Sequence, residues 1–140
     1  MTLWIIDTDH LSLLEREEPL VVENVNKRNP NCLAITVVSF EERMRGRFNT
    51  IRRANSDEQI IEAYSRLQIT AEFLKGFNLI GFDSEACSCF NDFRRQKIRV
   101  GTQDLRIAAI AFSRNAIVVT RNIRDFSKVP GLILEDWTVV

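Results

Sequence analysis

The chain has 140 residues, of which 45% are hydrophobic and 27% are charged, and these proportions fit one compact domain spanning residues 1–140. Nineteen basic residues balance nineteen acidic ones, so the net charge does not indicate the strongly basic surface typical of many nucleic-acid-binding domains. No window approaches the roughly 20 apolar residues of a membrane span, and the opening MTLWIIDTDHLSLLERE is too acidic for a secretory signal. We therefore expect a cytoplasmic protein with no membrane partner.

The first half of the chain predicts an alternation of buried strands and amphipathic helices. The expected elements are a strand at 3–6, helices at 8–17 and 19–27, a strand at 34–38, and a helix from there toward residue 47. Thr8 or Asp9 is the expected N-cap of the first helix, and Ser39 that of the third, because a short polar side chain accepts a backbone hydrogen bond there. The run AITVV predicts the second strand because it is apolar and rich in β-branched residues.

The second half continues the same alternation. The expected elements are a helix at 57–75, a weaker strand at 78–82, a helix at 84–96, a helix capped by Thr102, a strand at 116–120 and an edge strand at 132–136. The helix capped by Thr102 contains LRIAAIAF, which is apolar almost all round and must therefore be central. Such an order predicts the α/β class, as a single three-layer α/β/α domain around a mainly parallel sheet.

Acidic residues follow the predicted strands. The functional crevice of a parallel α/β sheet lies beyond the carboxyl ends of its strands. Four segments bring polar candidates to that edge: Asp7, Glu41, Glu42, Asp104, Asn122 and Asp125. Each alone has a structural alternative as a helix cap, a partner of the helix dipole or a turn residue. Together, carboxylates at one edge repel one another unless a cation compensates. Mg²⁺ or Mn²⁺ is the natural cofactor for such oxygen ligands, and it supports phosphodiester hydrolysis without a protein nucleophile.

Other metal and nucleophile chemistries are disfavoured. The chain has three cysteines, one histidine and no C-x-x-C pair, which excludes a typical zinc site. We expect the cysteines to be buried or half-buried free thiols rather than disulfides. His10 follows Asp9 at a helix start, and we expect it to lie on the surface rather than to act as a general base.

Several motifs, in order, resemble those of a known family. The runs IIDTDHLS, ITVVSFEERMRG, GTQDLRIAAIAF and VVTRNIRDFSKVPGL, with EDW near the end, are similar to bacterial PIN-domain proteins of the VapC toxin type over nearly the whole chain. The resemblance implies a PIN-like fold and a metal-dependent ribonuclease that is the toxin of a bacterial toxin–antitoxin pair. It further implies endonucleolytic cleavage of RNA, a cognate antitoxin and a homodimer.

The same resemblance assigns roles to individual residues. It makes Asp7 and Asp104 the metal-binding acids, and it makes Glu42 a third catalytic acid that binds the metal or orients its water. Glu42 is preferred over its acidic neighbour because its spacing from the preceding serine and the following glycine matches the family pattern. The last acidic position is open between Asn122 and Asp125. We expect Asp125 to complete the catalytic set, with Asn122 and Thr120 shaping the site through hydrogen bonds.

Two further interpretations stay open. A non-catalytic PIN-like RNA-binding or interaction module is possible because Asn122 stands where many relatives carry an acid. A receiver-like regulatory domain is disfavoured, because the predicted strands end in Ser39 and Thr120 instead of a phospho-acceptor aspartate and a lysine. The glycine motifs of nucleotide-binding folds are absent. Arginine-rich stretches at 43–53 and 94–99 are expected to position the RNA backbone if the chain is a nuclease.

Overall fold

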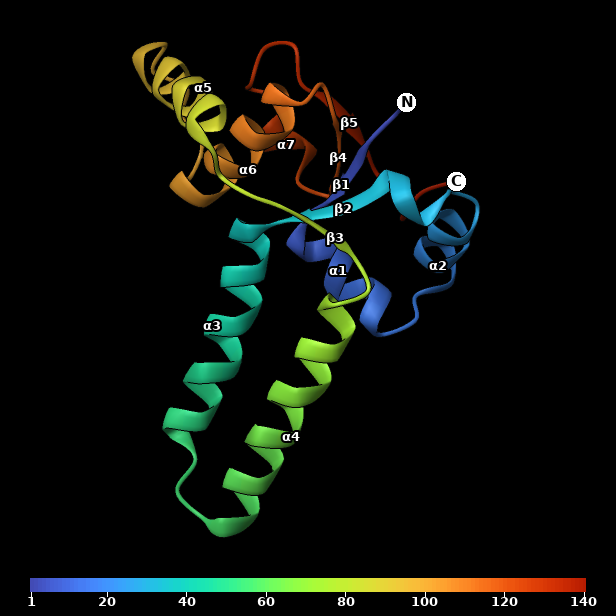
Figure 1. The fold of residues 1–140 in the computed structure, drawn as a ribbon, viewed down its shortest axis with the longest axis vertical. Helices are drawn as coiled ribbons and strands as arrows, with labels where there is room; N and C mark the ends of the chain where they lie inside the picture. The colour runs from blue at the N-terminus through green and yellow to red at the C-terminus, as the bar shows by residue number, and fades with distance from the viewer.

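The computed structural model describes residues 1–140 and centres on a five-stranded sheet, drawn in Figure 1. The strands lie in the order β3-β2-β1-β4-β5, and every neighbouring pair is parallel. Their bounds are β1 Trp4–Ile6, β2 Leu33–Thr36, β3 Asn78–Ile80, β4 Ile117–Val119 and β5 Ile133–Glu135. The predicted mainly parallel sheet and the predicted edge strand near the C-terminus are confirmed. Because β1 lies between β2 and β4, the carboxyl ends of these three strands share one edge of the sheet.

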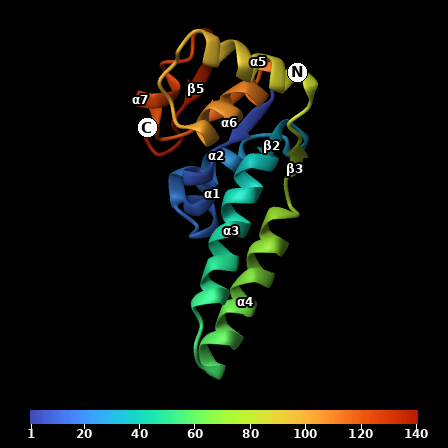
Figure 2. The same ribbon diagram turned by 90° about the vertical axis from the view of Figure 1, so that its left-hand side faces the viewer.

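Helices cover both faces of the sheet. Their bounds are α1 Thr8–Glu15, α2 Pro19–Asn26, α3 Val37–Arg53, α4 Asp57–Leu74, α5 Ser84–Arg95, α6 Thr102–Ser113 and α7 Ile123–Phe126. One core cluster joins a sheet face to α5, α6 and α7, and a second joins the other face to α1, α2 and the sheet-proximal parts of α3 and α4. Figures 1 and 2 show α3 and α4 as a long hairpin that projects away from the sheet. The predicted α/β/α arrangement is confirmed.

The strand sequences explain these two cores. Ile5 packs into the cluster on the α5–α6 side, whereas the adjacent Ile6 packs into the cluster on the opposite side. Ala34 and Ile35 alternate in the same way, because successive side chains of a strand point to opposite faces. The helix predicted to be central is α6, in which six residues are buried. Its apolar surface fixes the start of α6 against the sheet.

One strand ends earlier than its sequence predicts. The run AITVV does not stay extended to its end, because Val37 and Val38 form the first turn of α3. Thr36 caps this helix instead of Ser39, and its hydroxyl oxygen accepts a 3.1 Å hydrogen bond from the Ser39 amide. The cap outweighs the strand propensity of the two valines. The helix also continues to Arg53, beyond the predicted end, because it packs along α4.

Two other helices begin earlier than predicted. The N-cap of α1 is Asp7, so Thr8 and Asp9 lie within the first turn, and the N-cap of α6 is Gly101 instead of Thr102. Neither cap residue provides a side-chain hydrogen bond to its own helix. The carboxylate of Asp7 is therefore available for other contacts.

We predict that Thr36→Ala lowers the free energy of unfolding by about 1–2 kcal/mol, because it removes a buried helix cap. Urea unfolding followed by far-UV circular dichroism measures this loss. Thr50→Ala is the matched control, since Thr50 is exposed within the same helix and bonds only to the Gly46 carbonyl. Equal effects of the two substitutions would contradict the capping role.

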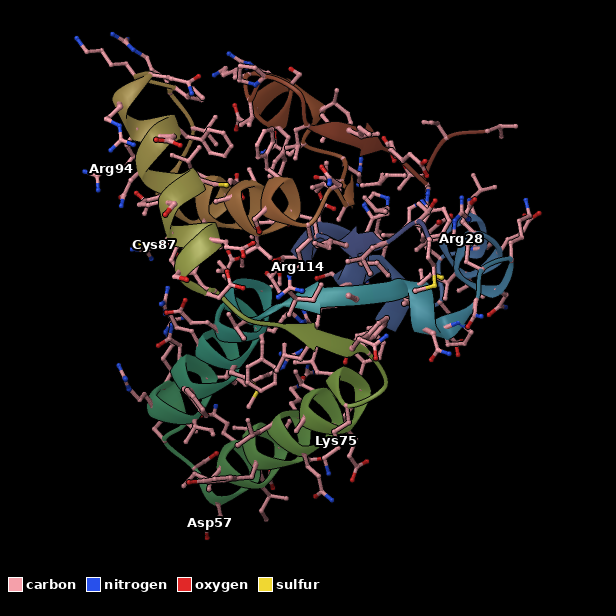
Figure 3. All side chains as sticks on the ribbon, turned by 45° about the horizontal axis from the view of Figure 1, so that its top comes forward. Arg28, Asp57, Lys75, Cys87, Arg94 and Arg114 are labelled. Atoms are coloured by element: carbon pink, nitrogen blue, oxygen red, sulfur yellow. The ribbon has the colours of Figure 1, made fainter.

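The cysteines follow their prediction only in part. All three are free thiols, as expected. Cys32 is buried and Cys89 is half-buried, but Cys87 is exposed on α5, so its predicted burial is wrong. Its position on the outer face of α5 is labelled in Figure 3. Separately, no helix in the structure has both the length and the apolar character that crossing a membrane requires.

Candidate active site

Asp7 lies directly after β1 at the carboxyl edge of the sheet. Its backbone amide donates to the Val119 carbonyl at 2.9 Å, which continues the pairing of β1 with β4. Its side chain is only 5% exposed, and its Oδ2 atom accepts a 2.8 Å hydrogen bond from the Thr120 hydroxyl. Burial, and then the charge of Asp9, raises the pKa of Asp7 to about 7, although hydrogen bonds from Thr120 and the Thr8 backbone oppose the rise. The surroundings of Asp7 therefore disfavour its ionised form.

Asp104 and Asp125 share one amide group. The Nδ2 atom of Asn122 donates to Oδ2 of Asp104 and to Oδ2 of Asp125, each at 3.2 Å, which its two N–H bonds allow. Burial, and then the charge of Asp125, raises the pKa of Asp104. The pKa of the more exposed Asp125 is lowered, chiefly by the Asn122 hydrogen bond and then by Lys128. The structure therefore brings both acids to the same end of β4.

Glu42 reaches the same edge from α3. Its Oε1 atom accepts a 3.0 Å hydrogen bond from the Thr8 hydroxyl, which also lies 3.1 Å from the hydroxyl oxygen of Ser39. Burial raises the pKa of Glu42, and the charge of Asp104 raises it further. Three of the four predicted catalytic acids therefore carry raised pKa values from burial and from neighbouring acids.

Glu41 points elsewhere. Its side chain accepts a 3.1 Å hydrogen bond from the Gln103 amide and pairs with Arg45 one turn along the helix. It is exposed, whereas Glu42 is half-buried. The preference for Glu42 over Glu41 agrees with this geometry.

Asp9, predicted from the sequence only as a helix cap, also lies at this edge of the sheet. Its Oδ2 atom accepts hydrogen bonds from the Arg121 amide at 3.0 Å and from the Thr120 hydroxyl at 3.3 Å. Its charge contributes to the raised pKa values of Asp7 and Asp104. The sequence signal for this position of Asp9 was its spacing from Asp7 at the start of a helix, because the first helical turn brings the second acid back toward β4.

The donor set fits a magnesium or manganese ion. Every candidate ligand is an oxygen, and no three His, Cys, Asp or Glu side chains converge tightly enough to enclose an ion by themselves. Mg²⁺ commonly uses one or two carboxylates and completes its shell with water and substrate phosphate. Burial, and then repulsion between neighbouring acids, raises the pKa values of Asp7, Glu42 and Asp104, and the charge of a divalent cation would offset both effects.

The arginine-rich stretches are partly committed to structural contacts. Arg43 forms an ion pair with Glu15 of α1, and Arg47 donates a 2.8 Å hydrogen bond to the Thr70 hydroxyl of α4. Arg94, which Figure 3 labels, is exposed on α5, and its guanidinium lies over a phenylalanine ring of the same helix. Arg43 and Arg47 therefore brace α3 against its neighbours, whereas Arg94 lies at the surface.

His10 is not on the surface, so that prediction is wrong. The side chain is fully buried, its Nδ1 atom lies 2.8 Å from Oδ1 of Asp9, and its Nε2 atom accepts a 3.0 Å hydrogen bond from the Trp137 amide. Because both ring nitrogens have partners, burial leaves no unpaired polar atom. The partner at the C-terminal end of the chain was invisible to local sequence patterns.

Comparisons with known proteins agree on one family of relatives. No protein-family model matches the chain. It is 31% identical over 111 residues to Ribonuclease VapC2 of Rickettsia felis, covering 76% of the chain and 75% of that relative. It is 29% identical over 123 residues to the tRNA(fMet)-specific endonuclease VapC of Salmonella typhimurium, covering 76% and 93% respectively. The crystal structure of DNA-bound VapBC from Salmonella typhimurium matches with a TM-score of 0.80 at 24% identity, over 98% of this chain and 99% of that one, and establishes the likeness of fold.

Proposed function

The chain belongs to the VapC ribonuclease family of toxin–antitoxin systems, and from this premise we propose that it is a metal-dependent endoribonuclease that hydrolyses phosphodiester bonds of RNA. The resemblance of its ordered motifs to VapC-type PIN-domain proteins is confirmed by this membership. One observation supports the metal dependence above all: Asp7, Glu42 and Asp104 converge at the sheet edge, and burial together with mutual repulsion raises their pKa values.

The proposed roles follow from the contacts of each acid. Asp7 and Asp104 would hold Mg²⁺ or Mn²⁺, which when bound activates water and neutralises charge on the scissile phosphate. Glu42 binds at the same centre or orients the attacking water, and the Thr8 hydroxyl fixes its carboxylate. Asp125 completes the acidic set, while Asn122 keeps it at a set distance from Asp104.

The protein partners are also proposals. We infer a cognate antitoxin, because solved structures similar to this chain include VapBC complexes, and we infer a homodimer from the resemblance of the motifs to the family. The exposed apolar side chains of the projecting hairpin support protein contacts there, and the most exposed are Phe48, Ile61, Tyr64 and Ile69. Light scattering of the purified chain, alone and after mixing with a candidate antitoxin, measures both associations. A monomer that captures no such protein would contradict them.

The metal requirement is tested by cleavage of RNA under controlled metal supply. The purified chain is incubated with a structured-RNA mixture, and separately with initiator tRNA, in EDTA, Mg²⁺ or Mn²⁺. We expect cleavage with either metal and none in EDTA. Cleavage that persists in EDTA would overturn the mechanism, and the absence of cleavage under every condition would favour the non-catalytic PIN-like module.

Asp125 has its own prediction. Asp125→Asn is expected to lower the cleavage rate about tenfold at limiting Mg²⁺, and less at saturating Mg²⁺, because it removes a charge that acts on Asp104. Asp92→Asn is the matched control, since Asp92 is exposed on α5 and pairs only with Arg95. A rate independent of Asp125 at every Mg²⁺ concentration would remove it from the catalytic set and leave Asn122 as the residue that completes the site.

A further inference from the structure

His10 is the only histidine of the chain, and its hydrogen bonds fix where its proton lies. The Trp137 backbone amide can only donate, so the Nε2 atom, 3.0 Å away, must accept. The ring proton therefore sits on Nδ1 and is donated to Oδ1 of Asp9 at 2.8 Å. Oδ1 of Asp136 lies 3.5 Å from Nε2 but accepts instead from the Thr138 amide and hydroxyl at 2.9 and 2.6 Å. The ring is thus a neutral connector with one donor and one acceptor.

The connection continues from Asp9 to the catalytic edge. One carboxylate oxygen of Asp9 accepts from His10, and the other accepts from the Arg121 amide and lies within 3.3 Å of the Thr120 hydroxyl. The same hydroxyl lies 2.8 Å from Oδ2 of Asp7. The Thr120 hydroxyl accepts from a backbone amide and has a single proton to donate, which the Asp7 and Asp9 carboxylates compete for, with the shorter contact to Asp7. The position of Asp9 therefore affects both the charge near Asp7 and the hydrogen bond that Asp7 receives.

Contacts of its side chain hold Trp137, the residue at the other end of this chain of hydrogen bonds, in place. Oε1 of Glu135 accepts hydrogen bonds from the indole nitrogens of Trp4 and Trp137 at 3.3 and 2.9 Å. The guanidinium of Arg28 lies 4.8 Å from the Trp4 ring centre and 4.2 Å from the Trp137 ring centre, and it pairs with Glu135. Figure 3 labels Arg28 beside α2. These contacts within and around the motif EDW hold the Trp137 backbone in place.

We propose that His10 is a positioning residue of the nuclease: it holds the Asp9 carboxylate beside Asp7 and takes its own orientation from the backbone of Trp137. The inference rests on the proposed metal-dependent function. Without the His10 donor, Oδ1 of Asp9 has no partner, and the side chain is free to turn away from Thr120. The metal-binding carboxylates then lose a fixed neighbour, although His10 itself touches neither metal nor RNA.

The first test reads the proton position directly in the metal-free wild type. Because there is one histidine, ¹⁵N NMR of the ring needs no assignment between residues. We expect a protonated Nδ1 and an unprotonated Nε2 at neutral pH. A proton on Nε2 would overturn the inference, because the ring then cannot accept from Trp137. This measurement needs no catalytic activity.

The second test separates positioning from packing. His10→Asn keeps a donor near the Nδ1 position, His10→Gln keeps a polar atom near the Nε2 position, and His10→Phe keeps ring volume without either. We measure Mn²⁺ affinity by calorimetry without RNA, then kcat and KM, and thermal unfolding for each. We expect Mn²⁺ affinity and kcat to fall about tenfold in the Gln and Phe variants with KM little changed, and to stay within about threefold in the Asn variant. The proposal would be overturned if the Gln variant kept the Mn²⁺ affinity and kcat of the wild type while the Asn variant did not.

A double substitution tests that His10 acts through Asp9. If it does, adding His10→Phe to Asp9→Asn lowers Mn²⁺ affinity no further than Asp9→Asn alone. Additive losses would overturn the inference while leaving the nuclease proposal intact, provided that the wild type binds Mn²⁺ and cleaves RNA. A wild type that binds no Mn²⁺ would instead overturn the proposed function, and with it the need for a positioning residue.

Discussion

Replacement of Asp7 or Asp104 by asparagine is expected to lower the rate of RNA cleavage by at least about 100-fold, because each change removes a charged oxygen ligand. The side chains keep their size. The Thr120 hydroxyl can still donate to a side-chain oxygen at position 7, and the Asn122 amide can still donate to one at position 104. Single-turnover cleavage of the RNA that the wild type cuts, measured across a Mg²⁺ titration, gives the rate. Calorimetry with Mn²⁺ gives the loss of metal binding independently.

Asp57→Asn is the control for both substitutions. Asp57 is exposed at the start of α4, at the far end of the hairpin from the sheet, where Figure 3 labels it. Cleavage by this variant should match that of the wild type. If either active-site variant retained full metal-dependent cleavage, the assignment of its residue as a metal ligand would be wrong.

The metal-free protein is expected to lose stability as the pH rises from about 4 to about 7, because Asp7 binds its proton more tightly when folded. Its pKa is about 7 in the folded chain against 3.8 for an ordinary aspartate. Between these values unfolding releases a proton, so the free energy of unfolding falls with rising pH, by about 4 kcal/mol at most at about 1.4 kcal/mol per unit. Below pH 4 both states are protonated, so this contribution to stability is fully present and no longer changes with pH.

Asp7→Asn isolates this contribution. In EDTA the variant should be more stable than the wild type by about 1–4 kcal/mol at pH 8, and the difference should vanish toward pH 4. Urea unfolding at several pH values measures it. Adding Mg²⁺ at pH 8 should restore the stability of the wild type but not change the variant. A pH-independent difference between the two proteins would contradict the burial of a titrating carboxylate.

The positions of the main acids were predictable because they depend on a local rule. Asp7, Glu42 and Asp104 each follow an apolar strand or open a helix, and parallel strands bring such positions together. Helix starts were less predictable. Thr36 lies within the β-branched run ITVV, and only the buried cap shows that Val37 already belongs to the helix.

The contribution of Asp9 and His10 could not be predicted from local patterns. His10 is polar and sits at a helix start, which in most sequences indicates a surface position. Its burial depends on the Trp137 amide, 127 positions away in the chain. A partner at that separation leaves no signal in the periodicity of either segment, so only the folded chain reveals it.

The order of the sheet also bears on when this enzyme becomes active during its own synthesis. The central strand β1 emerges first from the ribosome, but its neighbour β4 and the Thr120 and Asn122 that follow it emerge only after more than a hundred further residues. Trp137, which orients His10, comes later still. A nascent chain therefore carries Asp7 and Glu42 before their companions exist, and the acidic edge can assemble only after β4 and the residues that follow it have been synthesised.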